Sequence, residues 1–230
     1  MIPIRDHLAT TRVPYVTYAI VAACVLMFLW QLSLGGQGQT AVYALGAIPA
    51  VIFGEARLPA DIEMVPPLAT VFTSMFLHGG WMHLIGNMLY MWIFANNVED
   101  SMGHARFVVF YLVCGVAAVL AQSLPDVHSQ VPMIGASGAI SGVLGAYLLL
   151  FPHARVLVMI PLGVIMNAHY LPAVVVLGFY FVLQVIMTAM TPAGAGGVAF
   201  AAHLGGFAAG AALIPLFKHR SVPLFSKRVR

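Results

Sequence analysis

Apolar residues fall into six long stretches separated by shorter polar segments, and this alternation is the strongest pattern in the chain. The stretches cover residues 15–34, 71–97, 106–122, 136–151, 170–190 and 198–217. Most of them approach the roughly 20 residues that an α-helix needs to cross a bilayer. The pattern predicts an all-α integral membrane protein built as a bundle of six transmembrane helices.

The composition agrees with a membrane-embedded chain. Hydrophobic residues make up 61% of the 230 positions and charged residues 7%, whereas a soluble domain carries roughly 25% charged residues. The net charge of +3 gives no indication of nucleic-acid binding. Cys24 and Cys114 both lie in apolar stretches, so we expect packing residues rather than a disulfide or a metal site.

The polar segments divide the chain into three parts. We expect a cytoplasmic N-terminal tail at residues 1–14, one membrane domain at 15–217 and a basic cytoplasmic C-terminal tail at 218–230. The first apolar stretch is as long as a full span and lacks a small-residue cleavage site, so it is not a cleavable signal. The longest connection, 35–67, holds four of the 14 prolines and fits either an external loop or a partly embedded hairpin.

The basic residues predict the orientation. Six spans place both termini on one side of the membrane, and nine of the ten lysines and arginines then lie on that side; Arg57 is the exception. Because basic residues are enriched in cytoplasmic segments, we expect both termini in the cytoplasm and the 123–132 loop outside. The sequence shows neither a transit-peptide pattern nor a soluble extension, which favours a bacterial inner membrane.

Polar side chains within three of the stretches predict a shared site. The second stretch holds His83 and Asn87, which share a helix face; the fourth begins near Ser137, and the sixth holds His203. Any one of them alone is most simply an interhelical hydrogen bond, but all four are expected at one depth in the outer half of the bilayer. Intramembrane polar residues gathered in this way indicate function. Gln184, in the fifth stretch, is expected to make a packing hydrogen bond.

These residue types suit acyl transfer. A serine hydroxyl becomes a nucleophile when a neutral histidine accepts its proton, so Ser137 and His203 form a candidate nucleophile and base. His83, Asn87 and the backbone amide of Ser137 are candidate donors to an oxyanion. Every carboxylate of the chain lies in a predicted tail or loop, so the residues favour a Ser–His dyad.

The segment GASGAISG, residues 135–142, contains two serines with different surroundings. Ser137 has Gly135 two residues before it and Gly138 directly after it, which leaves room for a carbonyl. Ser141 is expected one turn deeper, without a base. We interpret Ser141 as a packing serine on a face of small residues formed by Gly138, Gly142 and Gly145.

Three motifs in order, HGGWMHLIGN, GASG and AHLGGFAAG, resemble the rhomboid family of intramembrane serine proteases over most of residues 70–213. The resemblance implies Ser137 as nucleophile, His203 as general base, and His83 with Asn87 in the oxyanion hole. His78 is similar to an additional structural histidine of the family. The supporting positions are Gly135, Gly138, Gly206 and Gly210.

The resemblance also implies a rhomboid-like six-helix fold with a water-filled cavity open to the outside, an embedded first loop and a movable fifth span. Glu99 and Gly103 resemble the family's polar closure at the inner end of span two. This chain departs from the family at Ala69 and Thr70, where many members have a Trp–Arg pair. It also has Ser141 where many have a tyrosine stacked on the catalytic histidine, so His203 has to be held in another way.

The expected function is therefore an intramembrane serine endopeptidase that cuts transmembrane helices near the outer face of the bilayer. Its expected partners are single-span or other transmembrane proteins and the lipid bilayer, with no cofactor, metal or nucleic acid; the oligomeric state is left open. One alternative is a catalytically inactive rhomboid-like protein that binds membrane proteins. Another is a metal or ion transporter using His78, His83 and His203, although the sequence lacks membrane carboxylates and HExxH-type spacing.

Overall fold

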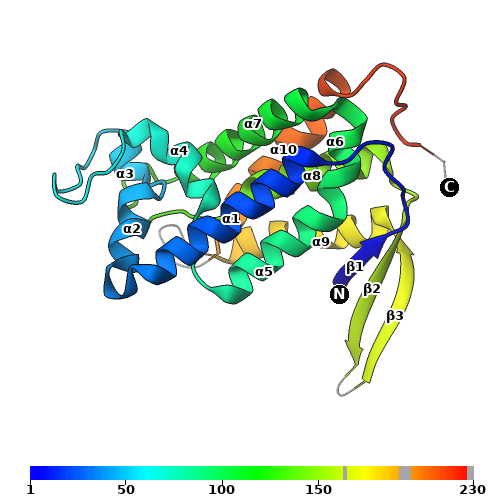
Figure 1. Cartoon of the computed structure of the whole chain (residues 1–230), viewed down its shortest axis with the longest axis horizontal. Coiled ribbons are helices and arrows are strands. Elements are labelled where there is room, and N and C mark those ends of the chain that lie inside the picture. Colours follow the sequence, from blue (N-terminus) through cyan, green and yellow to red (C-terminus); the bar gives the residue numbers. More distant parts are fainter. Residues whose placement is uncertain (163–164, 192–197, 227–230) are drawn as a thin grey trace.

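The computed structural model describes residues 1–162, 165–191 and 198–226 and shows a helical bundle with a small sheet at one end (Figure 1). Four described helices are long and apolar enough to cross a membrane. They are α1 (Tyr15–Ser33), α7 (His104–Ser123), α9 (Ala173–Met190) and α10 (Phe200–Phe217). The shorter α8 (Ser137–Leu150) lies among them. Most of the 191–197 loop and the basic residues Lys227, Arg228 and Arg230 lie outside the described residues.

The second apolar stretch is not one continuous helix. It begins with the short turns α4 (Thr70–Thr73) and η3 (Ser74–Phe76), and then the backbone is extended at Leu77. Helix resumes as α5 (Trp81–Tyr90), passes through a π-helical turn, η4 (Met91–Ala95), and ends as α6 (Asn96–Met102). The Gly79–Gly80 pair explains the break, because glycine pairs favour turns over helix.

The long first connection is folded onto the bundle. It contains η1 (Gly35–Gln37), α2 (Gly38–Leu45), α3 (Pro49–Ile52) and η2 (Pro67–Ala69). Ala47 pairs with Met133 through two backbone hydrogen bonds, and the Thr73 hydroxyl donates to the carbonyl of Leu45. The Ala47–Met133 pair fixes the connection against the segment that leads into α8, and the Thr73 bond fixes it against α4.

A three-stranded antiparallel sheet corrects the expectation of an all-α fold. Its order is β1 (Ile2–Asp6), β2 (Arg155–Leu162) and β3 (Ile165–Pro172). The hairpin occupies residues expected to form a connection and the beginning of the fifth span, and β1 lies in the expected N-terminal tail. Alternate burial explains β2, since Val156 and Val158 are buried on one face, and β-branched residues favour strands.

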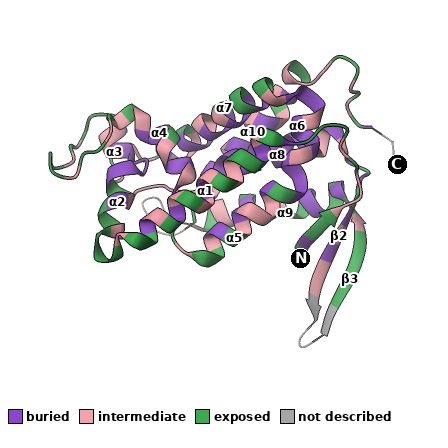
Figure 2. Cartoon of the chain, viewed as in Figure 1, coloured by how far each residue is buried: buried purple, intermediate pink, exposed green. Residues whose placement is uncertain are grey.

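Helix α8 lies at the centre of the bundle. Most of its residues are buried, whereas α1 has only four buried residues (Figure 2). A side chain at Gly206 would collide with the carbonyl of Gly138, and one at Gly210 with the carbonyl of Gly142. Helices α8 and α10 can approach this closely because both have glycines where they cross.

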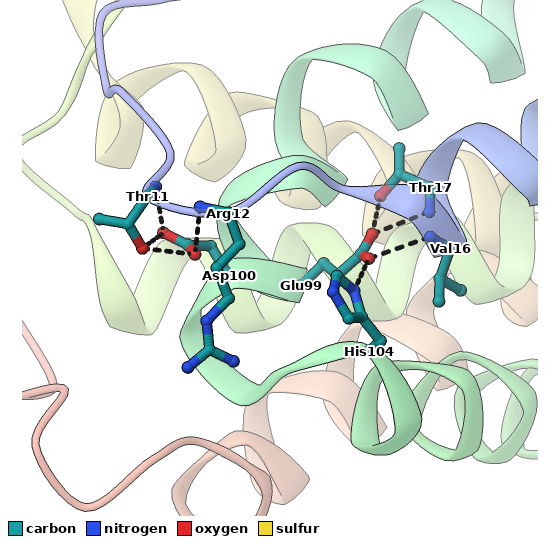
Figure 3. Close-up of polar contacts among 7 residues, drawn as sticks. All are labelled: Thr11, Arg12, Val16, Thr17, Glu99, Asp100 and His104. Carbon is teal, nitrogen blue, oxygen red and sulfur yellow. Dashed lines mark hydrogen bonds and ion pairs between the residues drawn. The ribbon is translucent and has the colours of Figure 1, made fainter.

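Two acidic residues hold the beginning of α1 against α6 and α7 (Figure 3). The buried Glu99 carboxylate accepts hydrogen bonds from the backbone amides of Val16 and Thr17 and from the Thr17 hydroxyl. Its other partner is Nδ1 of His104, at 2.6 Å. Glu99 thereby satisfies amides that the first turn of a helix leaves unpaired. Asp100 binds the backbone amides of Thr11 and Arg12 in the same way.

Candidate active site

Ser137 and His203 face each other across the contact between α8 and α10. The Ser137 Oγ lies 2.8 Å from the Nε2 of His203. Ser137 is the first residue of α8 and is half-buried, while His203 is 8% exposed. The glycine contacts between the two helices hold the serine and the histidine within hydrogen-bond distance.

His83 and Asn87 lie one turn apart on α5 and both face Gly135. Gly135 has a φ of +118°, and a Cβ built there would lie 2.7 Å from the His83 Nε2 and 3.7 Å from the Asn87 Nδ2. A residue with a side chain at this position would therefore be strained and would also displace His83. Glycine is what allows the loop before Ser137 to approach these two side chains.

Two donors point toward the region in front of Ser137. The Gly79 amide donates to the His83 Nδ1 at 3.3 Å, so the Nε2 of a neutral His83 carries the proton and is a donor. The buried Nδ2 of Asn87 has no hydrogen-bond partner among the described residues. A buried amide without a partner costs free energy, and a ligand oxygen at this site would satisfy it.

A cavity of about 1050 Å³ connects these residues. Its lining includes Ser137, His203, His83 and Asn87, together with Tyr180 of α9. The cavity is of the size that accommodates a small ligand or a short peptide segment. All four sequence-predicted polar groups therefore border one open space.

Tyr180 and Gln184 of α9 complete the surroundings of this site, beyond the four residues that the sequence predicts there. The Gln184 Oε1 lies 2.9 Å from the His203 Nδ1. The Tyr180 hydroxyl lies 2.8 Å from the Ser141 Oγ, which itself donates to the carbonyl of Ser137. The four-residue spacing of Tyr180 and Gln184 was the available signal, because it places both on one helix face.

His78 lies beside the site as part of its packing. It is 2% exposed, and its ring centroid is 5.2 Å from that of His83. Its backbone amide and carbonyl are both bonded to the side chain of Gln31 on α1. This position suits a residue that supports His83.

No cluster of three or more His, Cys, Asp or Glu side chains suited to a metal occurs in the part of the chain that the structure describes. Cys24 and Cys114 are both free and buried. The side chains that border the cavity offer a hydroxyl at Ser137, imidazoles at His203 and His83, and an amide at Asn87.

Comparison with known proteins gives a family match over two thirds of the chain. The family model for the rhomboid domain matches residues 67–220, which include Ser137, His203, His83 and Asn87. Rhomboid protein 1, mitochondrial, of Saccharomyces cerevisiae is 31% identical over 134 residues, covering 52% of this chain and 39% of the yeast protein. Rhomboid protease GluP of Bacillus subtilis is 35% identical over 136 residues, covering 59% of this chain and 24% of GluP.

A third relative extends the similarity to an animal protein. Presenilin-associated rhomboid-like protein, mitochondrial, of Bos taurus is 29% identical over 120 residues, covering 51% of this chain and 31% of the bovine protein. The matched region spans less than half the length of each of these three relatives. The family match and the long apolar helices together identify this chain as an integral membrane protein.

Proposed function

This chain belongs to the rhomboid family, and on that basis we propose that it is an intramembrane serine endopeptidase that cleaves other membrane proteins within or beside their transmembrane helices. The observation that supports this most is the 2.8 Å contact between the Ser137 Oγ and the His203 Nε2. It lies beside an Asn87 amide that has no partner among the described residues.

The proposed reaction begins with proton transfer. His203 Nε2 takes the proton of the Ser137 hydroxyl while Oγ bonds to the scissile carbonyl carbon, and the carbonyl π electrons move to the oxygen. That oxyanion accepts hydrogen bonds from the Asn87 Nδ2, the His83 Nε2 and the amide of Ser137. The carbon–nitrogen bond then breaks, the amine leaves with the proton held by His203, and water hydrolyses the acyl-enzyme with His203 again as base.

We further propose that the chain crosses the membrane six times. The four long helices make four of these crossings, and the continuous run α5–η4–α6 and the short α8 make the other two. Helix α8 begins with Ser137 on the side of the 123–132 loop, so the site opens near the outer face when both termini are cytoplasmic. We assign the protein to a bacterial inner membrane. Its substrates are single-span proteins whose helices unwind easily at that depth, because an intact helix keeps the scissile backbone hydrogen-bonded.

The second candidate function is that of an inactive family member that binds membrane proteins without cutting them. Both proposed reacting groups are present and in contact, which argues against this alternative. Metal or ion transport has less support, since the described part of the chain has no metal-ligand cluster. A metal chelator should leave proteolysis by a serine protease unchanged, and loss of proteolysis on chelation would contradict the Ser–His mechanism.

The deciding experiment labels the purified protein with a fluorophosphonate and locates the adduct by mass spectrometry. Ser137 should displace the fluoride and carry the label, and Ser137→Ala should lose both the label and proteolysis of a single-span substrate. Ser141→Ala is the matched control and should keep substantial activity, because Ser141 contacts Tyr180 and not the base. An adduct on Ser141, or cleavage by a clean preparation of Ser137→Ala, would overturn the proposal.

A further inference from the structure

Helix α9 presents the polar side chains of Tyr180, Gln184 and Thr188 toward the bundle, although it is otherwise largely apolar. Gln184 is 7% exposed. A buried amide within a membrane helix is costly unless its oxygen and nitrogen are bonded. The partner of the Gln184 oxygen is the ring of His203, at 2.9 Å, so this amide is positioned where it affects the proposed base.

The chemistry of the ring determines what this contact does. To accept the proton of Ser137, the His203 Nε2 must have a free electron pair, and the proton of the neutral ring then resides on Nδ1. An Nδ1–H group needs an acceptor, which the Gln184 Oε1 provides. The Nδ1–H tautomer satisfies both contacts of the ring: Nδ1 donates to the Gln184 Oε1, and Nε2 is free to accept the proton of the Ser137 hydroxyl, as the proposed base must.

We propose that Gln184 is a positioning residue that fixes His203 in the Nδ1–H tautomer and directs its Nε2 at Ser137; this inference rests on the proposed proteolytic function. Gln184 then occupies the place that a carboxylate has in a Ser–His–Asp triad. A neutral amide orients the imidazole without placing a charge in the membrane interior, where an ionised carboxylate is expensive.

A neighbouring hydrogen bond adds a second connection between α9 and the rest of the bundle. The Tyr180 hydroxyl bonds to the Ser141 side chain one helical turn from the Gln184–His203 contact, so α9 is tied to both α8 and α10. A rotation of α9 would break both bonds together. Gln184 of α9 thus contacts His203 in a chain that has Ser141, and not the tyrosine of many family members, four residues after the nucleophile.

The test compares three variants by the rate of fluorophosphonate labelling and by kcat and KM on a single-span substrate. Gln184→Leu removes the acceptor and keeps the bulk, Gln184→Glu keeps a carboxyl oxygen as acceptor in either protonation state, and Gln122→Leu is the matched control. The Gln122 Oε1 accepts the Ala202 amide at 3.2 Å, so this control breaks a bond to α10 without contacting the His203 ring.

Gln184→Leu should lower both the labelling rate and kcat by about 10- to 100-fold, because a misoriented base loses part of the rate that general-base catalysis contributes. The KM should stay within about twofold of the parent value. Gln184→Glu should recover most of that loss, and Gln122→Leu should stay within about threefold of the parent protein. A Gln184→Leu protein that melts earlier but labels at the parent rate would reduce Gln184 to a packing residue. A Gln184→Glu protein as slow as Gln184→Leu would overturn the role of acceptor.

Nitrogen NMR tests the inference with a readout that does not depend on catalytic activity. In histidine-labelled protein, with His203 identified by its loss in His203→Ala, the proton should reside on Nδ1 in the parent and distribute over both nitrogens in Gln184→Leu. An unchanged His203 signal in Gln184→Leu would overturn the inference. A parent protein that shows this tautomer but does not label at Ser137 would instead refute the proposed protease and retain the positioning role.

Discussion

At the scale of single residues, Gly135 is the position on which the geometry of the candidate site depends most. Its φ of +118° strains any residue with a side chain, and a Cβ built there would lie 2.7 Å from the His83 Nε2. Gly135→Ala should therefore displace His83 and lower the labelling rate of Ser137 by about 100-fold, the effect of losing one oxyanion donor.

Gly54→Ala is the control for Gly135→Ala, because it introduces backbone strain without displacing His83. Gly54 also has a positive φ, +79°, but a Cβ there would meet open space. This variant should cost stability and leave the labelling of the folded protein near the parent rate. Equal labelling losses in Gly54→Ala and Gly135→Ala would show that strain, and not the contact with His83, explains the effect.

Asn87 provides the clearest test of the proposed oxyanion hole. Its buried Nδ2 has no partner among the described residues, so no protein acceptor there competes with a developing oxyanion for this donor. Asn87→Ala should lower kcat by about 10²- to 10³-fold, and His83→Ala by a similar or smaller factor because water can replace the imidazole donor. Full activity of Asn87→Ala, measured on a single-span substrate, would remove Asn87 from the site.

The sequence predicts the meeting of Ser137, His203, His83 and Asn87 because polar residues are rare in the apolar stretches and their depths can be counted. Gln184 was noticed as polar but not assigned to the site. The four-residue spacing of Tyr180 and Gln184 places both on one face of α9, but it does not determine which residues of the bundle that face meets. Its contact with His203 follows from packing that only the structure shows.

At the scale of elements, the crossing of α8 and α10 determines the distance between Ser137 and His203. Gly210→Ala would place a methyl group against the carbonyl of Gly142, and overpacking of this kind costs about 1–3 kcal/mol. We expect a lower free energy of unfolding in detergent and a slower labelling rate, because the separated helices lengthen the contact between serine and histidine.

Gly178→Ala is the matched control for that substitution. Gly178 lies in α9, and a Cβ there has no neighbour within 4 Å. The added methyl group should leave the unfolding transition unchanged or raise it slightly, since alanine favours helix over glycine. Equal destabilisation by Gly210→Ala and Gly178→Ala would contradict the close contact of α8 with α10.

The helical pattern predicts the long elements better than the short ones. α1, α7, α9 and α10 begin and end close to the limits of four apolar stretches. The sequence pattern does not predict the hairpin of β2 and β3. Its residues are largely apolar and adjoin a span, so length and hydropathy do not distinguish strand from helix there. Its partner β1 lies about 150 residues earlier in the chain, and no local pattern predicts such a pairing.

At the scale of the whole molecule, Asp6 ties the N-terminal strand to the bundle. Its Oδ2 accepts hydrogen bonds from the Tyr147 hydroxyl at 2.6 Å and the Asn97 side chain at 2.7 Å. Burial raises the pKa of the Asp6 carboxyl from 3.8 to about 6, against the opposing effects of the Tyr147 hydrogen bond and the nearby His7.

This raised pKa predicts how stability changes with pH. Between about pH 4 and pH 6 the folded state holds the Asp6 proton and the unfolded chain releases it, so the free energy of unfolding should fall as the pH rises through that range. Asp6→Asn, which cannot titrate, should lose this part of the slope. Melting temperatures in detergent measure it, and an identical slope in both proteins would contradict the buried position of Asp6.

The orientation of the whole bundle follows from where its charges lie. The Arg106 side chain bonds to the carbonyl of Phe217 at the end where α7 begins and α10 ends, and Lys218 lies at the same end. Arg57 and the 123–132 loop belong to the opposite end. Because cytoplasmic segments are enriched in basic residues, a reporter fused after residue 230 should read cytoplasmic, and one inserted at 123–132 should read external. The reversed result would place Ser137 in the inner half of the bilayer and refute cleavage near the outer face, while the contact between Ser137 and His203 would stand.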